Sequence, residues 1–348
     1  MSHRFLMLSL LLGAVAGAVP GRGFAGGHAD ATVALDGSGD FTSVQAAIAG
    51  ASTPGDGKYW TIRIKPGRYH ERIYVQREKR FVRLIGDDAT TTVLTYDLHA
   101  GVPGEDGKPI GTFRTPSVYV DADDFAAENL TIENAAGPVG QALAIRVDGD
   151  RVIFRNCRFL GWQDTVLVNR GRHYFEDCYI AGHVDFIFGG ATAYFENCLL
   201  HCLRDGYITA ASTPADVPFG YVFRGCSISG ETPEVKTYLG RPWRDHAAVA
   251  FVATTMSEVV RPEGWHNWGR PEREITSRYQ EHGSTGPGSH STARVAWTKP
   301  LDQEEAAALT PQRVLGGEDG WNPVAVIKNW LHGSVFRRAT SMLGQFLP

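Results

Sequence analysis

The chain carries one short motif that recurs at nearly even intervals, and this repeat limits the folds open to it. The copies are FRNC at 154–157, FEDC at 175–178, FENC at 195–198 and FRGC at 223–226, and their cysteines lie 21, 20 and 28 residues apart. A weaker copy, AENLTI at 127–132, has Leu130 in place of the cysteine. A period near 20 with one strand-like segment per unit, and no helix between units, indicates stacked coils of strands.

The repeat therefore predicts an all-β chain folded as a β-solenoid, a single-stranded parallel β-helix. Parallel strands usually need a helical crossover, which a solenoid avoids because each coil returns through further strands of its own. The alternative is chance recurrence in an all-β sandwich, and four copies argue against it. Residues 36–51 predict a turn and a short helix that caps the stack, with Val44, Ala47 and Ile48 on its apolar side. From about residue 262 the pattern is less periodic, which predicts a C-terminal wrap along the solenoid.

The first residues have the pattern of a secretory signal. Arg4 precedes an apolar run at 5–19 and then small residues, which predicts a signal peptide over 1–25 with cleavage between 18 and 25. The alternative, a membrane anchor, would have to span the bilayer with a short run. We expect a secreted or periplasmic protein with a solenoid domain over 26–323 and an unassigned tail over 324–348. The net charge of −4 gives no electrostatic basis for binding nucleic acid or an anionic membrane.

Five cysteines are an odd number for an exported chain. Cys178 and Cys198 fall on adjacent coils, where the strand spacing permits a disulfide. A reduced interior stack fits the same positions equally well.

The repeat also places two carboxylates. Asp164 lies seven residues after Cys157, and Asp185 lies seven residues after Cys178. If the coils are in register, the two side chains lie one above the other, about 4.8 Å apart. Two carboxylates this close ionise over separate pH ranges, so that one can act as an acid and the other as a base. Asp205 has the same spacing from Cys198, but the longer interval that follows suggests a register change, and we leave it out of the pair.

Two carboxylates suggest glycoside hydrolysis, but the neighbours of this pair favour a different chemistry. Gln163 precedes Asp164, and Gln141 falls on the preceding coil; amide donors beside a carboxylate pair suit a developing oxyanion. Arg241 could bind an aspartate through two hydrogen bonds and keep it ionised. Trp243 offers a flat apolar face to a sugar ring. Any one of these residues alone is more often structural, and their joint presence is the stronger argument.

Four segments, GQALA, GWQDTV, VDFIFGG and YLGRPW, resemble the signature motifs of pectin methylesterases (pectinesterases), in the same order and at similar intervals. The likeness extends over about residues 31–323, and GHVDFIFGGA and YITAASTP look closer to bacterial members of this family than to plant ones. The resemblance implies a right-handed parallel β-helix that removes methyl esters from the galacturonate of pectin, giving pectate and methanol. It implies no metal or organic cofactor. The expected partner is pectin, bound by a monomer, with no nucleic-acid or membrane partner after signal removal.

The resemblance also implies a role for each matching residue. Asp185 matches a nucleophile that forms an acyl-enzyme anhydride, and Asp164 matches the acid that protonates the leaving methoxide and then activates water. Gln141 and Gln163 match the donors to the oxyanion. Arg241 matches the residue that holds Asp185 ionised, and Trp243 matches a substrate-stacking aromatic residue.

Weaker candidates for substrate binding are Phe113 and Ser117, which fall where the family lines its groove, and Phe186, Tyr207 and Trp268. Core packing explains each of them at least as well. Pro116 is unusual for a strand, so the sequence does not decide how the groove wall beside Ser117 is built.

Three other functions stay open. The chain could be an esterase for another acyl or alkyl group, a β-helix polysaccharide lyase or hydrolase acting on pectin, or a non-catalytic carbohydrate-binding solenoid. A lyase would need calcium ligands and a proton-abstracting base, and no clustered acidic set occurs beyond the proposed pair. A binding module would be expected to lack the acid, the nucleophile or the arginine, and none is missing.

Overall fold

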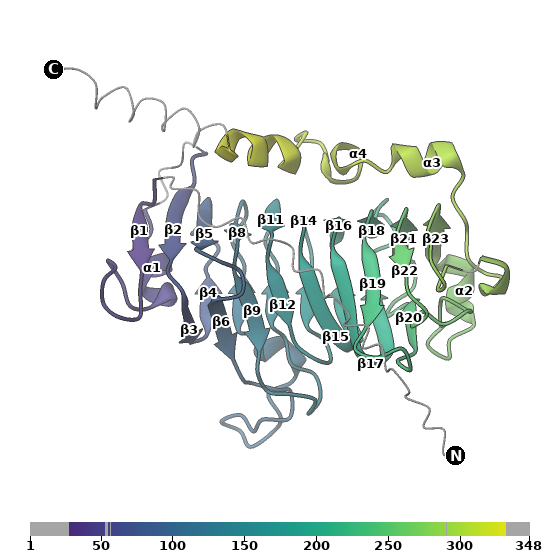
Figure 1. Ribbon diagram of the computed structural model, residues 1–348, viewed down its shortest axis with the longest axis horizontal. Helices are drawn as coiled ribbons and strands as arrows, with labels where there is room; N and C mark the ends of the chain where they lie inside the picture. The colour runs from purple at the N-terminus through teal and green to yellow at the C-terminus, as the bar shows by residue number, and fades with distance from the viewer. Residues whose placement is uncertain (1–27, 53–54, 56, 290, 332–348) are drawn as a thin grey trace, which may run out of the picture.

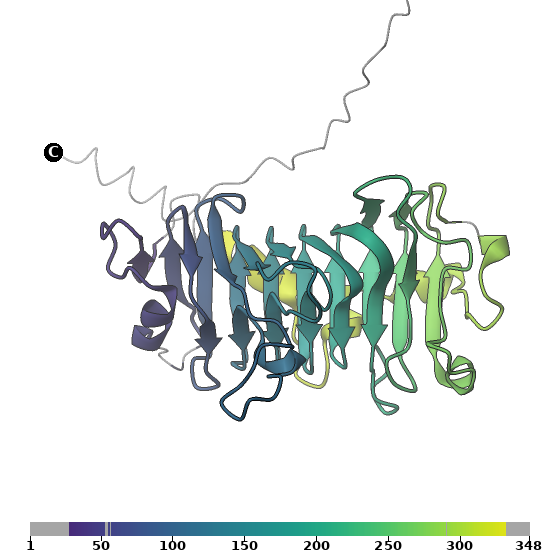
Figure 2. The ribbon, with the colours of Figure 1, turned by 90° about the horizontal axis from the view of Figure 1, so that it is seen from below.

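Successive coils of the chain stack along one long axis, and each coil contributes strands to flat parallel walls (Figure 1; Figure 2 gives the view from below). The computed structural model describes residues 28–52, 55, 57–289 and 291–331. Every pairing between successive named strands is parallel, so the expected parallel β-helix is confirmed. The proposed signal peptide lies outside the described residues. Among those that are described, no helix is long and apolar enough to cross a membrane.

Wall A is a ten-stranded sheet with one strand from each coil. Its strands alternate residues that face the interior with residues that face a C-terminal segment, so both faces of the sheet are covered and both are apolar. In order along the stack they are β1 (Ala31–Val33), β2 (Trp60–Ile64), β5 (Val82–Gly86), β8 (Ala126–Glu128), β11 (Val152–Arg155), β14 (Arg172–Glu176), β16 (Thr192–Glu196), β18 (Tyr221–Arg224), β21 (Ala248–Val252) and β23 (Arg278–His282).

The other two walls form one sheet because two long strands, β15 (Tyr179–Gly189) and β17 (Leu199–Ala211), bend from one wall into the other. Besides these two, wall B contains β3 (Gly67–His70), β6 (Thr92–Tyr96), β9 (Thr131–Asn134), β12 (Arg158–Leu160), β19 (Ser227–Gly230) and β22 (Thr255–Met256). Wall C contains β4 (Ile73–Val75), β7 (Val118–Val120), β10 (Ile145–Val147), β13 (Val166–Val168) and β20 (Thr237–Gly240).

The repeated motif marks the corner between wall A and wall B. Its third residue has a positive φ in every coil, which only Gly, Asn and Asp adopt readily, and this explains why the motif reads Asn, Asp or Gly there. Its first residue builds a ladder of phenylalanine rings inside the stack, with centroids 4.4–4.9 Å apart, close to the spacing of neighbouring strands. The ladder consists of Phe154, Phe175, Phe195, Phe223 and Phe251.

The cysteines of the motif form a second interior ladder beside the phenylalanines. All five cysteines are free and buried, so the structure has the reduced stack rather than a disulfide between Cys178 and Cys198. Leu130 takes the equivalent position one coil earlier and is fully buried, as the weaker copy of the motif predicts. Burial raises the pKa of the Cys157 thiol to about 12, so it stays protonated and acts as a small apolar side chain.

The predicted capping helix is confirmed as α1 (Val44–Gly50), which lies at the N-terminal end of the stack (Figure 1). Ser43 caps it by accepting a hydrogen bond from the Ala46 amide. Glu71, which follows β3, accepts hydrogen bonds from the Ser43 hydroxyl and from the Val44 amide, both at 2.7 Å. The buried residues of α1 are Val44, Ala47 and Ile48, the three that the sequence predicts.

The C-terminal strap, which we define as residues 301–331, returns along the outer face of wall A from the last coil towards the first (Figure 1). It contains α3 (Gln303–Ala308), α4 (Pro311–Leu315) and a helix over residues 323–331, so the described part of the tail expected from residue 324 is helical. Before the strap, the chain forms α2 (Glu272–Thr276) and two short 3-10 helices, Thr112–Arg114 and Ser291–Ala293. The expected C-terminal wrap is thus present.

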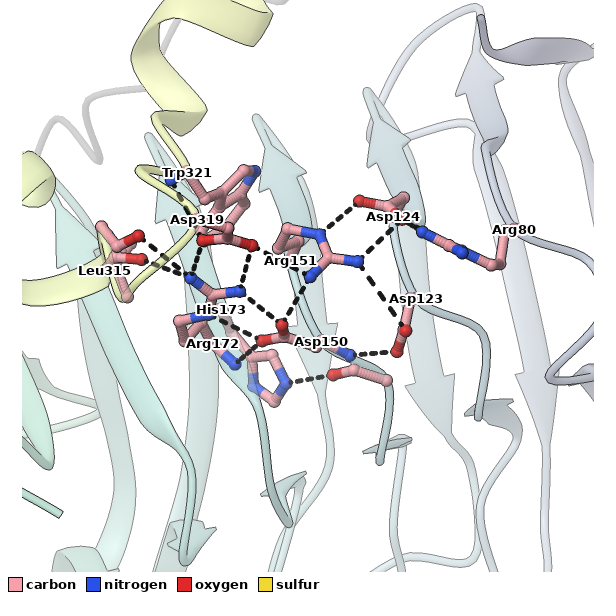
Figure 3. A network of polar contacts seen from close by, with 12 residues as sticks. Arg80, Asp123, Asp124, Asp150, Arg151, Arg172, His173, Leu315, Asp319 and Trp321 are labelled. Atoms are coloured by element: carbon pink, nitrogen blue, oxygen red, sulfur yellow. Dashed lines mark hydrogen bonds and ion pairs between the residues drawn. The ribbon is translucent and has the colours of Figure 1, made fainter. Parts of the chain in front are cut away.

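Ion pairs fasten the middle of the strap to the wall (Figure 3). Asp319 pairs with two arginines of wall A, at 2.6 Å from Arg172 Nη1 and at 3.2 Å from Arg151 Nη1. The same arginines bind Asp150 and Asp124, so that charges of opposite sign alternate across three coils. Hydrogen bonds from Arg172 hold the pKa of the Asp319 carboxyl well below its ordinary value of 3.8.

We expect Asp319→Asn to lower the free energy of unfolding by about 1 kcal/mol at neutral pH, because the partly exposed ion pair is lost. A carboxyl whose pKa is lower in the folded state stabilises the fold above its unfolded pKa. The difference between wild type and variant should therefore shrink as the pH falls below 3.8. Urea unfolding at several pH values measures it, with the exposed neighbour Glu318→Gln as control. Equal stability of Asp319→Asn and wild type at pH 7 would show that these ion pairs do not fasten the strap to wall A.

Candidate active site

A cleft of about 240 Å³ opens at the corner between wall B and wall C. It brings together eight of the residues that the sequence singles out for the site: Phe113, Gln141, Gln163, Asp164, Asp185, Arg241, Trp243 and Trp268. The rest of the lining consists of Thr112, Phe188 and Ala210. Because these residues come from seven successive coils, only the in-register stack can place them around one space.

The two aspartates occupy equivalent places on adjacent coils, as the repeat predicts. The Asp164 amide donates a hydrogen bond to the Val184 carbonyl at 3.0 Å, and two residues further on Val166 pairs with Ile187. Both aspartates have a positive φ, 66° for Asp164 and 51° for Asp185, where the chain turns from wall B into wall C. Aspartate adopts this conformation more readily than most residues, so the turn accommodates both carboxylates.

The register change expected near Asp205 is also confirmed. The pairing of β15 with β17 shifts on both sides of Val184, so Val184 pairs with Tyr207 and Ile187 pairs with Thr209. Asp205 therefore falls away from the cleft, where its side chain is 65% exposed and accepts a hydrogen bond from the Lys236 amide.

A bidentate ion pair with Arg241 stabilises Asp185, which is buried beside a run of apolar residues. Arg241 Nε lies 2.9 Å from Asp185 Oδ1, and Nη2 lies 2.7 Å from Oδ2. Both side chains are largely buried, so the pair is shielded from solvent and its geometry is fixed. Arg241 follows β20, and its backbone amide binds the Thr209 carbonyl at 2.9 Å. Gly240 is needed before it, because a Cβ there would lie 1.9 Å from Thr209 Oγ1.

Two aromatic rings contact the guanidinium of Arg241, one from a residue earlier in the chain and one from a residue later in it. Its Cζ lies 3.8 Å from the ring centroid of Tyr207 and 3.7 Å from that of Trp268. Tyr207 is itself stacked on Tyr238, at 5.4 Å between centroids. The cation–π contacts add to the ion pair and leave Arg241 little freedom to move away from Asp185.

The environment separates the two carboxylates in pKa. Burial, then the negative charge of Asp185, raises the pKa of Asp164 to about 8, and Arg241 opposes this only in part. Burial also raises the pKa of Asp185, but the hydrogen bonds and charge of Arg241 oppose the shift and keep it smaller than that of Asp164. Near neutral pH the pair therefore holds its proton on Asp164 and its negative charge on Asp185.

The amide side chains of Gln141 and Gln163 are free to bind a ligand. The two residues are bridged on adjacent coils, and both line the cleft. Neither side-chain amide makes a hydrogen bond to another residue within the described part of the chain; the backbone carbonyl of Gln141 accepts one from the Ala100 amide at 2.8 Å. Two unengaged donors beside an ionised carboxylate suit a negatively charged oxygen that forms during a reaction.

An apolar floor extends from the carboxylates along the outer face of wall C. It consists of Leu143, Leu167, Phe188 and Ala210, with Trp243 and Trp268 packed against it. Phe188 does not share the interior with Phe186 and Ile187, because after the turn at Asp185 the alternation of the strand directs it outward. That alternation is the signal that could have identified it. Thr112 and Ala210 carry no comparable sequence signal.

Three of the predicted substrate-binding residues do not reach the cleft. Phe186 is 0% exposed and belongs to the interior core. Ser117 is also 0% exposed; its hydroxyl donates to the Glu133 carbonyl and accepts from the Tyr96 amide, so it joins two walls. Tyr207 packs behind Arg241 instead of lining the cleft. Pro116 precedes β7 and so does not interrupt it.

Comparisons with known proteins agree with this geometry. The family model described as Pectinesterase matches residues 30–318. Pectinesterase 31 of Arabidopsis thaliana is 44% identical over 281 residues, which cover 79% of this chain and 88% of that protein.

Two solved structures are similar as well. Pectin methylesterase from carrot superposes with a TM-score of 0.78 at 31% identity, covering 84% of this chain and 94% of that one. A pectin methylesterase in complex with a hexasaccharide has a TM-score of 0.74 at 30% identity, covering 86% of this chain and 99% of that one. The expected closer likeness to bacterial members is not supported, since the curated relative and the carrot enzyme are both plant proteins.

We expect Asp164→Asn to stabilise the fold near pH 8. The folded state keeps the proton of Asp164 up to about pH 8, whereas an exposed aspartate releases it near 3.8. The native state then binds more protons between these values, so this group lowers the stability of the wild type as the pH rises. The gain should be small at pH 4 and on the order of 1 kcal/mol or more at pH 8. Thermal unfolding measures it, with the exposed Asp216→Asn as control; a loss of stability at pH 8 would refute the assignment.

Proposed function

The chain belongs to the pectinesterase family of carboxylic ester hydrolases, and we propose that it removes the methyl esters of pectin through an aspartyl acyl-enzyme. The observation that carries this mechanism is the pair in the cleft: an ionised Asp185 fixed by Arg241, next to an Asp164 that holds a proton. A nucleophile and an acid are thereby both present at neutral pH, formed from the same residue type.

The first half of the reaction transfers the acyl group to the enzyme. An oxygen of Asp185 attacks the carbonyl carbon of the galacturonate methyl ester, and the carbonyl oxygen becomes an oxyanion that the amides of Gln141 and Gln163 stabilise. When the intermediate collapses, the bond to the methoxy oxygen breaks and Asp164 gives its proton to that oxygen. Methanol leaves, and galacturonate remains joined to Asp185 as an anhydride.

The second half returns the enzyme to its starting state. Asp164, now a carboxylate, takes a proton from a water molecule, whose oxygen attacks the carbonyl carbon of the anhydride. The bond to Asp185 breaks, and the sugar unit leaves as a carboxylic acid that loses its proton to solvent and becomes galacturonate. Asp164 keeps the proton taken from the water and is again the acid. The charge that returns to Asp185 is held by Arg241, so the nucleophile is ready for the next ester.

The apolar floor suits a polysaccharide substrate. Phe113, on the rim of the cleft and 45% exposed, together with Trp243 and Trp268, offers aromatic faces to sugar rings beside the reacting ester. A related pectin methylesterase was solved with a bound hexasaccharide, which supports binding of several sugar units in this place.

The site is complete within one chain, which fits action as a monomer. The amino-terminal sequence pattern supports action outside the cytoplasm, in the periplasm or after secretion. We propose that residues 26–323 supply the catalytic domain.

The purified protein should release methanol from highly esterified pectin, with or without a metal chelator. Asp185→Asn should lower the rate at least about 10³-fold, because the amide is not a nucleophile. Asp205→Asn is the matched control, since it has the same spacing from its cysteine but lies outside the cleft, and it should keep wild-type activity. Circular dichroism tests whether the variants fold. Shortened chains with unsaturated ends and no methanol would establish a lyase instead.

The rate of methanol release should have a bell-shaped dependence on pH. It falls at low pH as Asp185 becomes protonated, and it falls at high pH as Asp164 loses its proton near pH 8. Methanol release measured as kcat/KM across the range, corrected for spontaneous hydrolysis of the ester, checks both limbs. A rate that keeps rising well above pH 8 would show that Asp164 does not act as the acid.

A further inference from the structure

The proposed reaction removes the negative charge that holds Arg241. Within the described part of the chain, the side chain of Arg241 makes hydrogen bonds to one residue, Asp185, at 2.9 Å from Nε and 2.7 Å from Nη2. Before the reaction Asp185 is ionised, and this ion pair fixes the arginine. In the acyl-enzyme an oxygen of Asp185 is bonded to the carbonyl carbon of the sugar, so the side chain is a neutral anhydride and the ion pair is lost. Only other contacts can keep the guanidinium in place during that stage.

Tyr207 supplies a contact that does not depend on a negative charge. The Arg241 Cζ lies 3.8 Å from the centroid of its ring, so the guanidinium lies on the ring face. A ring face attracts a cation through the ring quadrupole, and the attraction is strongest where water is excluded. The side chain of Arg241 is only 17% exposed. This contact therefore persists when Asp185 becomes neutral.

The ring of Tyr207 is itself firmly mounted. Tyr207 of β17 pairs with Tyr238 of β20, and their rings stack at 5.4 Å between centroids with only 11° between their planes. The ring of His266 lies against both tyrosines, at 5.5 Å and 5.3 Å between centroids. The hydroxyl of Tyr207 makes no hydrogen bond to another residue of the described chain, so its contribution comes from the ring.

Trp268 covers the opposite face of the guanidinium, at 3.7 Å from Cζ to the ring centroid. It has a φ of 63°, which is unfavourable for a bulky side chain, and its amide donates a hydrogen bond to His266 Nδ1 at 2.9 Å. Burial, then the charge of Arg241, lowers the pKa of His266 from its ordinary value of 6.5, so that Nδ1 stays an acceptor at neutral pH. Trp268 also lines the cleft, whereas Tyr207 does not, so a change at Tyr207 leaves the sugar contacts intact.

We propose that Tyr207 is a positioning residue for the second half of the reaction, in which its ring keeps Arg241 beside Asp185 while Asp185 is an anhydride. Water adds its oxygen to the carbonyl carbon and gives a proton to Asp164. The bond from that carbon to the Asp185 oxygen then breaks with its electron pair on the oxygen, and the guanidinium already in place stabilises the charge as it forms. This inference rests on the proposed function, because only an acyl-enzyme leaves Asp185 neutral.

Loss of the ring should therefore slow one half of the reaction more than the other. During acylation the ion pair with Asp185 holds Arg241 without help. The value of kcat/KM covers the steps up to the departure of methanol, whereas kcat also includes hydrolysis of the anhydride. A variant without the ring should lower kcat and KM together and leave kcat/KM nearly unchanged, which a general loss of active-site order would not do.

The test measures initial rates of methanol release from highly esterified pectin. Tyr207→Leu should lower kcat and KM by about tenfold each, as expected for a lost cation–π contact in a site that excludes water. Tyr207→Phe keeps the ring and should match wild type. With a methyl-esterified oligogalacturonide and an acid quench, intact-mass spectrometry should find a larger fraction of Tyr207→Leu than of wild type carrying the sugar chain. Tyr207→Met serves the same test if the leucine variant does not fold, which circular dichroism checks.

Tyr119→Leu is the matched control. The ring of Tyr119 lies on the same wall beneath Arg146, at 4.6 Å, and Arg146 makes an equivalent bidentate pair with Asp148 outside the cleft. Its kcat and KM should not change.

Two results in folded Tyr207→Leu would overturn the inference and leave the proposed function in place. One is a kcat/KM that falls as far as kcat at unchanged KM. The other is wild-type values of kcat, KM and the acylated fraction. Release of no methanol by wild type would instead refute the proposed function.

Discussion

Alignment between coils is the constraint on which the rest of this structure depends. Each wall is a ladder of parallel strands in which identical or similar side chains lie directly above one another, and the phenylalanine ladder shows the result at its plainest. The corner residues with positive φ turn every coil at the same place, so an error of one residue would reverse which side chains face the interior. The same alignment brings residues from seven coils around the cleft, although they lie up to 156 positions apart in the sequence, from Thr112 to Trp268.

Within that frame, the site depends on a contrast between two equally buried carboxyl groups. Burial raises the pKa of both and so favours the protonated form, which is not a nucleophile. A single arginine, paired with one of them and held between two aromatic rings, makes the difference. The cost of burying Asp185 is thus offset by Arg241, while Asp164 retains the proton that the chemistry requires.

The sequence was sufficient for features that repeat and insufficient for features that occur once. The motif predicted the solenoid, the equivalence of Asp164 with Asp185 and the register change before Asp205, because each follows from counting residues between coils. The capping helix was predicted separately, from the apolar pattern of residues 36–51. Sequence proximity to the site misplaced Phe186, which lies in the interior core, Ser117, which is buried just before β7, and Tyr207, which lies behind Arg241. Their orientation depends on local turns that break the alternation of strand residues, and counting does not reveal these. The strap along wall A was expected only in outline, since its ion pairs join residues about 150 positions apart.

The strap has a mechanical consequence for the whole molecule. A solenoid alone is a linear array in which each coil touches only its neighbours, so its ends can fray while its middle stays folded. Here one segment contacts the array at both ends: Arg224 binds carbonyls of α3 and its C-cap near the last coils, and Trp330 packs on Tyr59 beside the first. Unfolding of an end coil therefore also detaches the strap, which exposes the apolar outer face of wall A on the coils between the two ends. The coils should therefore not unfold independently, and the whole domain should unfold in one cooperative transition.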